Sequence, residues 1–221
     1  QSRVQYIPHC IDLKLHANIK NNKKKSETFV VRYLGTLYSQ QTEYLEIFMR
    51  SFDLFIEYLL NLEYKEKDLI NKVKFEFIGT KSSTLENMIE NQKYDAYFKI
   101  LPRVSYEKSL KLMHEAKLLL LPLYSQNQKV VNVFSSKIID YIGSQNQCLI
   151  VGEQCEDFRI ITKQNYPLIN TQEKCLKKLI NVFNNCQRTK QELTIGDYIN
   201  MEQFSIKTLS ERFMSFKNNE Q

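Results

Sequence analysis

Short apolar runs alternate along the chain with longer segments in which apolar residues recur every three to four positions. Runs too short for a helix and bounded by Gly or Pro are typical of strands buried on both faces of a sheet. The runs are 29–34 (FVVRYL), 73–78 (VKFEFI), 98–101, 118–123, 148–151 and 167–169. They predict about six parallel strands, with an edge strand at 167–169, where Pro167 is tolerated.

The segments between these runs predict amphipathic helices. The longest is 42–62, whose apolar side chains are Leu45, Phe48, Met49, Phe52, Phe55, Ile56, Leu59 and Leu60. Ser105 is a predicted N-cap for the next long helix, with Tyr106, Leu110 and Met113 on its buried face. Further helices are expected at 82–90, 137–142, 156–162, 171–184 and 197–216. Segment 14–27 is polar and lysine-rich, and we expect a loop there.

The alternation of strands and helices predicts an α/β protein with one Rossmann-like, doubly wound parallel sheet and helices on both faces. No repeat or composition shift marks a second domain within the sheet region, and the two terminal segments are expected to lie away from the sheet core. In such sheets ligands bind beyond the carboxyl ends of the strands. The residues that stop the predicted strands at this edge are Gly35, Gly79, Pro102, Pro122 and Gly152.

Composition and charge narrow the class of partner. The chain has 221 residues and a formal net charge of +6, but its lysines are dispersed, with a single run at 23–25. This mild basic excess fits an anionic ligand or peripheral contact with the inner face of a membrane, and it disfavours nucleic acid. No apolar run approaches the roughly 18 residues of a membrane span. The N-terminus also lacks a signal-peptide pattern, so we expect a cytoplasmic location.

The five cysteines are odd in number, and none of them forms a C-x-x-C pair. We therefore predict five free thiols in a reducing compartment, with Cys148 and Cys175 in the core. The three histidines are widely separated: His9 and His16 lie in the N-terminal segment, and His114 lies at a predicted solvent-facing position of a helix. Without a histidine pair or an acidic cluster, no metal site is expected.

Several familiar motifs are absent. The first strand is followed by a single glycine rather than G-x-G-x-x-G, and the chain has neither a phosphate loop of the G-x-x-x-x-G-K-[ST] type nor a G-x-S-x-G elbow. The stretch 135–140 (SSKIID) offers instead two serines, a lysine and an aspartate at a predicted helix start. Such a start suits phosphate, and a carboxylate one turn further suits ribose hydroxyls. A serine N-cap with solvated Lys137 and Asp140 is the alternative that this stretch alone leaves open.

Six segments in order resemble the C-terminal half of a GT-B type glycosyltransferase, close to the retaining group-1 family. These segments are 6–13 (YIPHCIDL), 31–38 (VRYLGTLY), 75–79 (FEFIG), 101–122, 135–152 and 204–213 (FSIKTLSERF). The first resembles the hinge that leads into the second domain of these enzymes. The resemblance therefore implies a hinge and loop at 1–27 and a nucleotide-sugar-binding domain at 28–221. Since the chain begins at Gln1 without Met, we expect an N-terminal acceptor domain to precede it.

The resemblance also implies roles for particular residues. Asp140 matches a Glu that accepts hydrogen bonds from the donor ribose, Arg103 lies where the base is lined, and Lys137 faces the phosphates. The full set of matched nucleotide-sugar-binding positions is Gly35, Thr36, Arg103, Val104, Ser135, Ser136, Lys137 and Asp140. Two departures are plain. Asp replaces the longer Glu, and the turn after the first strand (GTLYSQQ) lacks the basic pair that neutralises the diphosphate in many members.

The activity implied is transfer of a sugar from a nucleoside diphosphate to an acceptor hydroxyl with retention at the anomeric carbon. The partners implied are a nucleotide sugar and a sugar or lipid-linked acceptor bound through the other domain. No cofactor and no metal are expected, because protein cations and helix N-termini stabilise the departing diphosphate in this family. The catalytic residues are not identified, and this half alone is expected to transfer nothing. The missing basic pair favours one alternative, a non-catalytic interaction or scaffold domain on the same fold.

Overall fold

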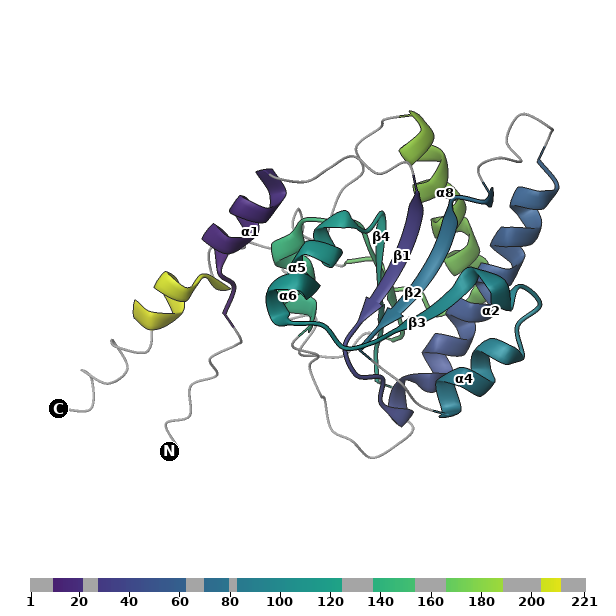
Figure 1. Ribbon diagram of the computed structural model, residues 1–221, viewed down its shortest axis with the longest axis horizontal. Helices are drawn as coiled ribbons and strands as arrows, with labels where there is room; N and C mark the ends of the chain where they lie inside the picture. Colours follow the sequence, from purple (N-terminus) through teal and green to yellow (C-terminus); the bar gives the residue numbers. More distant parts are fainter. Residues whose placement is uncertain are drawn as a thin grey trace.

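A single parallel sheet lies at the centre of the molecule (Figure 1). The computed structural model describes residues 10–21, 28–62, 70–79, 83–124, 137–153, 166–188 and 204–211. The strands are β1 (Phe29–Leu34), β2 (Val73–Ile78), β3 (Phe98–Leu101), β4 (Leu118–Pro122) and β5 (Cys148–Val151). Their order is β3-β2-β1-β4-β5, and every neighbouring pair is parallel. The predicted α/β class and doubly wound parallel sheet are confirmed.

The predicted sixth strand is wrong. Residues 167–169 contribute only an isolated parallel bridge between Val151 and Ile169, in which Ile169 N–H donates to Ile150 and Gly152 N–H donates to Ile169. Pro167 has no N–H to extend this pairing, so the segment stops at one bridge. The sheet of the described residues therefore has five strands.

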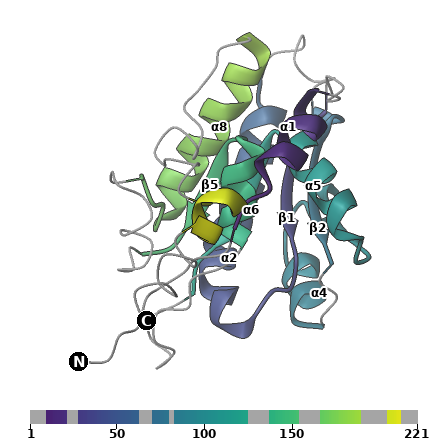
Figure 2. The same ribbon diagram turned by 90° about the vertical axis from the view of Figure 1, so that its left-hand side faces the viewer.

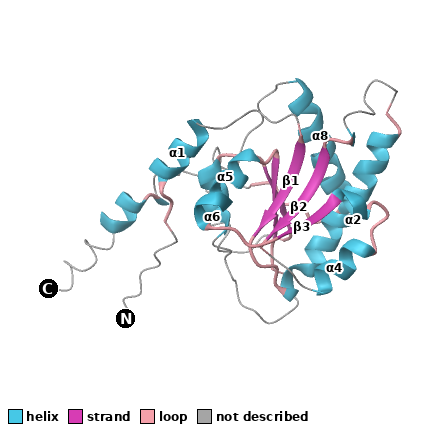
Figure 3. Cartoon of the chain, in the orientation of Figure 1, coloured by secondary structure: helices cyan, strands magenta, loops and turns pink. Residues whose placement is uncertain are grey.

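Helices cover both faces of the sheet, as Figures 1 and 3 show. On one face lie α2 (Thr42–Leu60), α4 (Ser83–Glu90) and α8 (Gln172–Arg188), and on the other lie α5 (Tyr106–Glu115) and α6 (Lys137–Ser144). This arrangement follows from right-handed crossovers: the chain moves outward from β1 to β3 on one face and returns through β4 and β5 on the other. The helix predicted at 156–162 lies outside the described residues.

The long helix α2 packs on the sheet through phenylalanine rings, as its periodicity predicted. Phe48 and Phe52 are fully buried and meet Phe75 of β2, with ring centroids 4.6 and 5.9 Å apart respectively. Phe52 also contacts Phe98 of β3 edge-on at 5.0 Å. Tilted and edge-to-face pairs of this kind add to the stabilisation that comes from burial alone. Leu60, assigned to the same face, is instead exposed at the end of the helix.

Residues 14–21 of the segment expected to be a loop belong to a helix, α1 (Leu13–Asn21), so the expectation is wrong for them, and residues 22–27 lie outside the described residues. Asp12 caps it by accepting a hydrogen bond from Leu15 N–H at 2.9 Å. The helix packs on α5 and α6 rather than on the sheet (Figure 2). Leu13, Leu15 and Ile19 are partly buried against the core, which stabilises a helix that the pattern of lysines concealed.

The described parts of the two terminal segments, 10–12 and 204–211, lie side by side beside α5 and α6 (Figure 2). Ile11 and Ser205 form a parallel bridge, in which Ile11 N–H donates to Phe204 at 2.7 Å and Ile206 N–H donates to Ile11. Both segments lie outside the sheet, as predicted, yet Ile11 and Phe204 are buried in the common core. Residues 206–211 continue as a helix, which agrees with the predicted closing helix.

The four cysteines within the described residues form no disulfide. Cys148 and Cys175 are buried, as predicted, and Cys10 and Cys186 are exposed. Cys155 lies outside the described residues, so the prediction of five thiols is tested for four of them.

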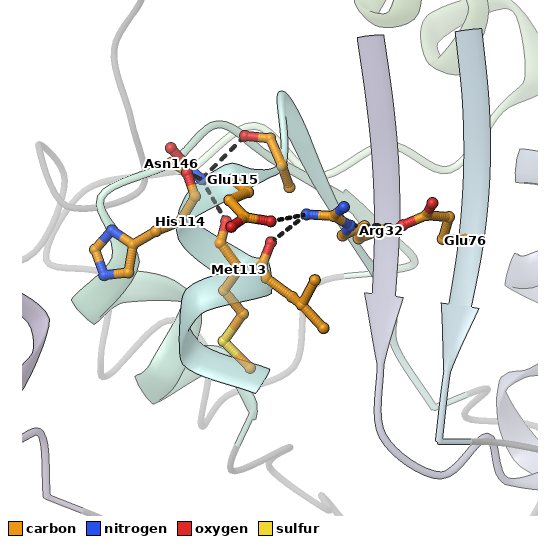
Figure 4. Close-up of polar contacts among 8 residues, drawn as sticks. Arg32, Glu76, Met113, His114, Glu115 and Asn146 are labelled. Carbon is orange, nitrogen blue, oxygen red and sulfur yellow. Dashed lines mark hydrogen bonds and ion pairs between the residues drawn. The ribbon is translucent and has the colours of Figure 1, made fainter. Parts of the chain in front are cut away.

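The C-terminal end of α5 is tied to the sheet by buried polar groups (Figure 4). Arg32 of β1 pairs with Glu76 of β2 at 2.7 Å and donates to the Leu112 carbonyl at 2.8 Å. Asn146 donates through Nδ2 to the carbonyls of Met113, His114 and Ala116. The last carbonyls of a helix have few donors within it, and here the two side chains add to the Ala116 N–H, which bonds the Leu112 and Met113 carbonyls. They fix α5 in place against β1.

A pair of buried histidines joins α1 to α5. His16 Nδ1 lies 3.0 Å from His114 Nε2, and the two residues are 3% and 2% exposed. The expectations that His16 lies in a loop and that His114 faces solvent are wrong, because α1 covers that side of α5. A Cβ at Gly143 would lie 2.5 Å from His16 Nε2, so the glycine allows α6 to pack directly against the ring.

Breaking the largely buried Arg32–Glu76 ion pair should destabilise the protein much more than breaking an exposed ion pair. Glu76→Ala should lower the free energy of unfolding by about 3 kcal/mol, because it leaves a buried guanidinium with fewer partners. The loss lies at the low end of the usual range for a broken buried pair because Glu115 remains 3.5 Å from Arg32. Urea unfolding measures this loss. Glu46→Ala, which breaks an exposed pair with Arg50, is the control and should cost about 0.5 kcal/mol or less. Equal losses for the two variants would contradict the prediction.

The histidine pair predicts that stability falls in mild acid. Burial lowers the pKa of His16 below its ordinary value of 6.5, and this effect outweighs the charge of Asp12, which acts in the opposite direction. The folded chain therefore binds this proton more weakly than the unfolded chain, so the stabilisation is present above about pH 6.5 and is lost as the pH falls below it. The loss is at most about 1.4 kcal/mol per pH unit for one proton.

Urea unfolding at about pH 7.5, 6.5 and 5.5 measures this dependence. His16→Gln should flatten it. A wild-type stability that is level between about pH 6.5 and 5.5 would show that the pair makes no such contribution.

Candidate functional site

The site begins where β1 and β4 part. Their pairing consists of Val31 with Leu118 and Arg32 with Leu119. Beyond this point the hydroxyl of Tyr141 lies between the strands, accepting a hydrogen bond from Leu34 N–H at 3.3 Å and donating to the Leu120 carbonyl at 3.2 Å. The chain reverses its direction of winding between β1 and β4, so this is the switch point at which such sheets form their ligand crevice.

A pocket of about 230 Å³ opens at the carboxyl ends of β1 and β2, beneath the start of α5 and α6. It brings together side chains from segments that are far apart in the sequence. Its lining residues are Leu34, Gly35, Ile78, Gly79, Arg103, Val104, Tyr106, Ser109, Met113, Lys137 and Asp140. The pocket therefore combines an apolar floor with a small number of polar and charged groups, a composition typical of small-molecule sites.

Five of the eight predicted site residues line this pocket: Gly35, Arg103, Val104, Lys137 and Asp140. Thr36 does not line it, but its carbonyl accepts a hydrogen bond from Lys137 Nζ at 2.8 Å. Ser135 and Ser136 lie outside the described residues. The structure thus gathers six predicted residues around one place.

Lys137 is the first residue of α6, and its side chain reaches back to the turn after β1. Nζ donates to the Tyr33 hydroxyl at 2.6 Å and lies 4.6 Å from the centroid of the Tyr33 ring. Gly35 makes this approach possible, because a Cβ there would lie 2.4 Å from Lys137 Cε. Gly35 also has φ +111°, a conformation that disfavours any other residue.

The hydrogen-bond acceptors around the Lys137 ammonium are neutral oxygens, the Tyr33 hydroxyl and the Thr36 carbonyl. Desolvation by burial lowers the pKa of Lys137 to about 8. The same burial raises the pKa of the Tyr33 hydroxyl well above its ordinary value, so Tyr33 remains a neutral partner. Lys137 is therefore a partly desolvated cation, and a bound anion would stabilise its charged form.

Asp140 lies one turn after Lys137 and accepts a hydrogen bond from the Tyr106 hydroxyl through Oδ1 at 2.9 Å. Ser105 caps α5 as predicted, accepting a hydrogen bond from Lys108 N–H. Tyr106, however, is 56% exposed, so its assignment to the buried face of α5 is wrong. It is the first residue of the helix, and it lines the pocket. Its place directly after the cap was the only sequence signal for this role.

Gln41 was not predicted, yet it fixes the turn after β1. It is fully buried, and its Nε2 donates to the Pro122 carbonyl at the end of β4 at 2.7 Å. Its Oε1 accepts a hydrogen bond from Tyr38 N–H at 3.1 Å. Tyr38 itself is exposed, and the centroid of its ring lies 6.0 Å from that of Tyr124. A polar residue at a helix start carries no sequence signal for burial, which is why Gln41 was missed.

The described residues contain no group of three or more His, Cys, Asp or Glu side chains arranged to hold a metal ion. Among the described helices, none is both long enough and apolar enough to span a membrane.

No protein-family model and no curated protein sequence matches the chain. Solved structures do match it. TarM of S. aureus is 14% identical with a TM-score of 0.58, over 97% of this chain and 38% of TarM. HepE of Anabaena, in complex with UDP-glucose, is 12% identical with a TM-score of 0.61, over 95% of this chain and 56% of HepE. Sucrose-phosphate synthase of Thermosynechococcus elongatus is 10% identical with a TM-score of 0.63, over 99% and 53% respectively.

The chain spans between 38% and 56% of the length of these three proteins. The matched proteins are GT-B glycosyltransferases. At 10% to 14% identity the likeness is one of fold. The chain has the fold of a GT-B C-terminal-like domain, which is the fold that the sequence resemblance predicted.

Proposed function

We propose that the chain is the donor-binding half of a glycosyltransferase that moves a sugar from a nucleoside diphosphate to an acceptor hydroxyl. One observation carries the proposal. Lys137 and Asp140, a cation and a carboxylate one helical turn apart, line the same pocket at the carboxyl ends of the strands, together with Gly35 and Arg103. Of the functions considered, nucleotide-sugar binding is the one that uses all four of these positions.

Lys137 is proposed to face the diphosphate. Its ammonium is preorganised by two neutral acceptors, and Lys137 is itself the first residue of α6. A helix N-terminus and a cation together attract an anion. As the bond to the sugar breaks, negative charge develops on the leaving diphosphate, and preorganised donors stabilise it without reorganisation. This single cation would perform part of the task of the basic pair that the turn after β1 lacks.

Asp140 is proposed to accept hydrogen bonds from the ribose hydroxyls, and Arg103 and Val104 to line the base. The carboxylate has two oxygens with about four acceptor sites, so it can hold Tyr106 and a ribose together. The matched HepE structure contains UDP-glucose, and the matched pneumococcal GtfA structure, at 11% identity and a TM-score of 0.53 over 38% of its length, contains UDP and GlcNAc. These ligands support a nucleotide sugar as the class of substrate.

The remainder of the reaction depends on a second half. We propose that an N-terminal domain binds the sugar or lipid-linked acceptor, and that transfer proceeds with retention, without metal or cofactor. The 221-residue chain alone is then expected to bind the donor and to transfer nothing. We also propose that the protein is located in the cytoplasm, with or without peripheral contact with the inner face of a membrane.

Asp140→Ala tests the ribose contact. A lost charge-assisted hydrogen bond costs about 1.5–3 kcal/mol, so binding of UDP should weaken about tenfold or more. Titration followed by chemical-shift changes suits the weak binding expected of a half enzyme. Glu173→Ala is the matched control, because this exposed carboxylate lies on α8 at the other face of the sheet and pairs only with a surface lysine. If UDP, GDP and ADP all leave the resonances of Arg103 and Asp140 unmoved in the wild-type chain, the proposed function is wrong.

The pKa of Lys137, about 8, predicts a pH dependence of binding. The side chain is charged below this pKa and neutral above it, so affinity for UDP should fall by up to about tenfold between about pH 7 and 9. Bound anion would shift the midpoint upward, because it favours the charged form. Lys137→Met should bind UDP weakly with no such decline, and Lys177→Met on α8 should behave as wild type. An undiminished affinity at about pH 9 would exclude Lys137 from the phosphate site.

A further inference from the structure

Tyr106 links the two helices that form the mouth of the pocket. It is the first residue of α5, and its hydroxyl donates at 2.9 Å to Oδ1 of Asp140, in the first turn of α6. Both residues line the pocket, as does Ser109 one turn along α5. The Tyr106 side chain is more than half exposed, so its position is not imposed by packing in the core. The hydrogen bond to Asp140 is the polar contact that orients it.

We propose that Tyr106 is a positioning residue for donor recognition: it holds the Asp140 carboxylate in the orientation that accepts hydrogen bonds from the ribose of a nucleoside diphosphate. This inference rests on the proposed function and extends it. It assigns discrimination between ribose and deoxyribose to a pair of residues rather than to Asp140 alone.

The length of the side chain explains why Asp140 needs a partner. An aspartate has one methylene group less than a glutamate, so its carboxylate lies nearer the helix backbone and reaches less far into the pocket. A hydrogen bond from a phenol to a carboxylate is charge-assisted and therefore among the stronger kinds. Fixing one oxygen of Asp140 restricts the side-chain rotamer and reduces the entropy lost when a ribose binds.

The electrostatic surroundings keep Tyr106 in its donor state. Desolvation, and after it the negative charge of Asp140, raise the pKa of Tyr106 above its ordinary value of 10. Asp12, in the segment before α1, acts in the same direction. The phenol therefore remains protonated through the neutral range, and its proton is available to Asp140 whenever a nucleotide binds.

A competing role for the same contact has the opposite consequence. If the Tyr106 hydroxyl occupied the place of a ribose hydroxyl, it would have to leave before the donor could bind. Removal of the hydroxyl would then strengthen binding. The sign of the change on Tyr106→Phe separates the positioning role from this blocking role.

The test compares UDP with its 2′,3′-dideoxy analogue, which lacks the hydroxyls that Asp140 would hold. Affinities are measured by chemical-shift titration of the full 221-residue chain. Wild type should prefer UDP, and Tyr106→Phe should reduce this preference about threefold to tenfold while leaving affinity for the dideoxy analogue unchanged. In an Asp140→Ala background, Tyr106→Phe should have no further effect, since the two residues act as a unit. Tyr58→Phe on α2, at the other face of the sheet, is the matched control.

Each outcome decides between roles. A preference for UDP that Tyr106→Phe leaves unchanged, or an equal loss for both ligands, would reduce Tyr106 to a structural contact and overturn the proposal. Tighter binding of UDP would overturn it in favour of the blocking role. Wild type that binds UDP and the dideoxy analogue equally well would refute ribose recognition by this pair while preserving nucleotide binding. Absence of binding to either ligand would refute the proposed function itself, and the inference with it.

Discussion

The structure depends on the separation of β1 and β4 beyond the residues that pair. If β1 and β4 kept their backbone hydrogen bonds along their whole length, no gap would remain between their carboxyl ends. Here the Tyr141 hydroxyl takes up Leu34 N–H on one strand and the Leu120 carbonyl on the other. Both backbone groups are satisfied, so the strands can part without the cost of unpaired polar groups in the core. Gln41 likewise donates a hydrogen bond to the Pro122 carbonyl, two residues further along β4. The pocket can lie next to this opening because the backbone groups of the two strands already have side-chain hydrogen-bond partners.

The same opening accounts for the unusual surroundings of Lys137. The turn after β1 contains Gly35, and the missing Cβ leaves room for the lysine side chain to lie across the backbone. The ammonium then meets a tyrosine ring, a hydroxyl and a carbonyl. Each of these groups orients the cation without cancelling its charge, unlike the carboxylate of an ion pair. A lysine that is already paired with a carboxylate attracts an incoming anion less strongly. In the proposed function, this arrangement leaves the charge of Lys137 available to the phosphates of the donor.

The sequence predicted those features that depend on local pattern. Five of the six predicted strands, the glycines that end three of them and the placement of Lys137 and Asp140 on one short helix all follow from apolar runs and their spacing. It could not predict α1, because the apolar contacts that stabilise this helix come from α5 and α6, and its lysines hide a short apolar face. The burial of His16 and His114 has the same cause: each ring is covered by the helix that carries the other. Tyr106 was misplaced because helical periodicity assigns a side chain to a face and does not show where the neighbouring layer ends.

The two ends of α5 are built for different tasks, and this difference positions the site. At the C-terminal end, Arg32 and Asn146 satisfy the carbonyls within a well-packed region, so that end is held by several polar contacts at once. At the N-terminal end, Ser105 caps the helix and Tyr106 extends past it toward Asp140. Because α5 is a short, regular helix of ten residues, fixing its C-terminal end also fixes the direction of its axis. The contacts of Arg32 on β1 therefore help to determine the position of Tyr106 at the other end. Stability is thus concentrated at one end of α5, and the residues available for recognition lie at the other. Arg32 thus lies outside the pocket but holds the helix that supplies Tyr106, Ser109 and Met113 to its lining.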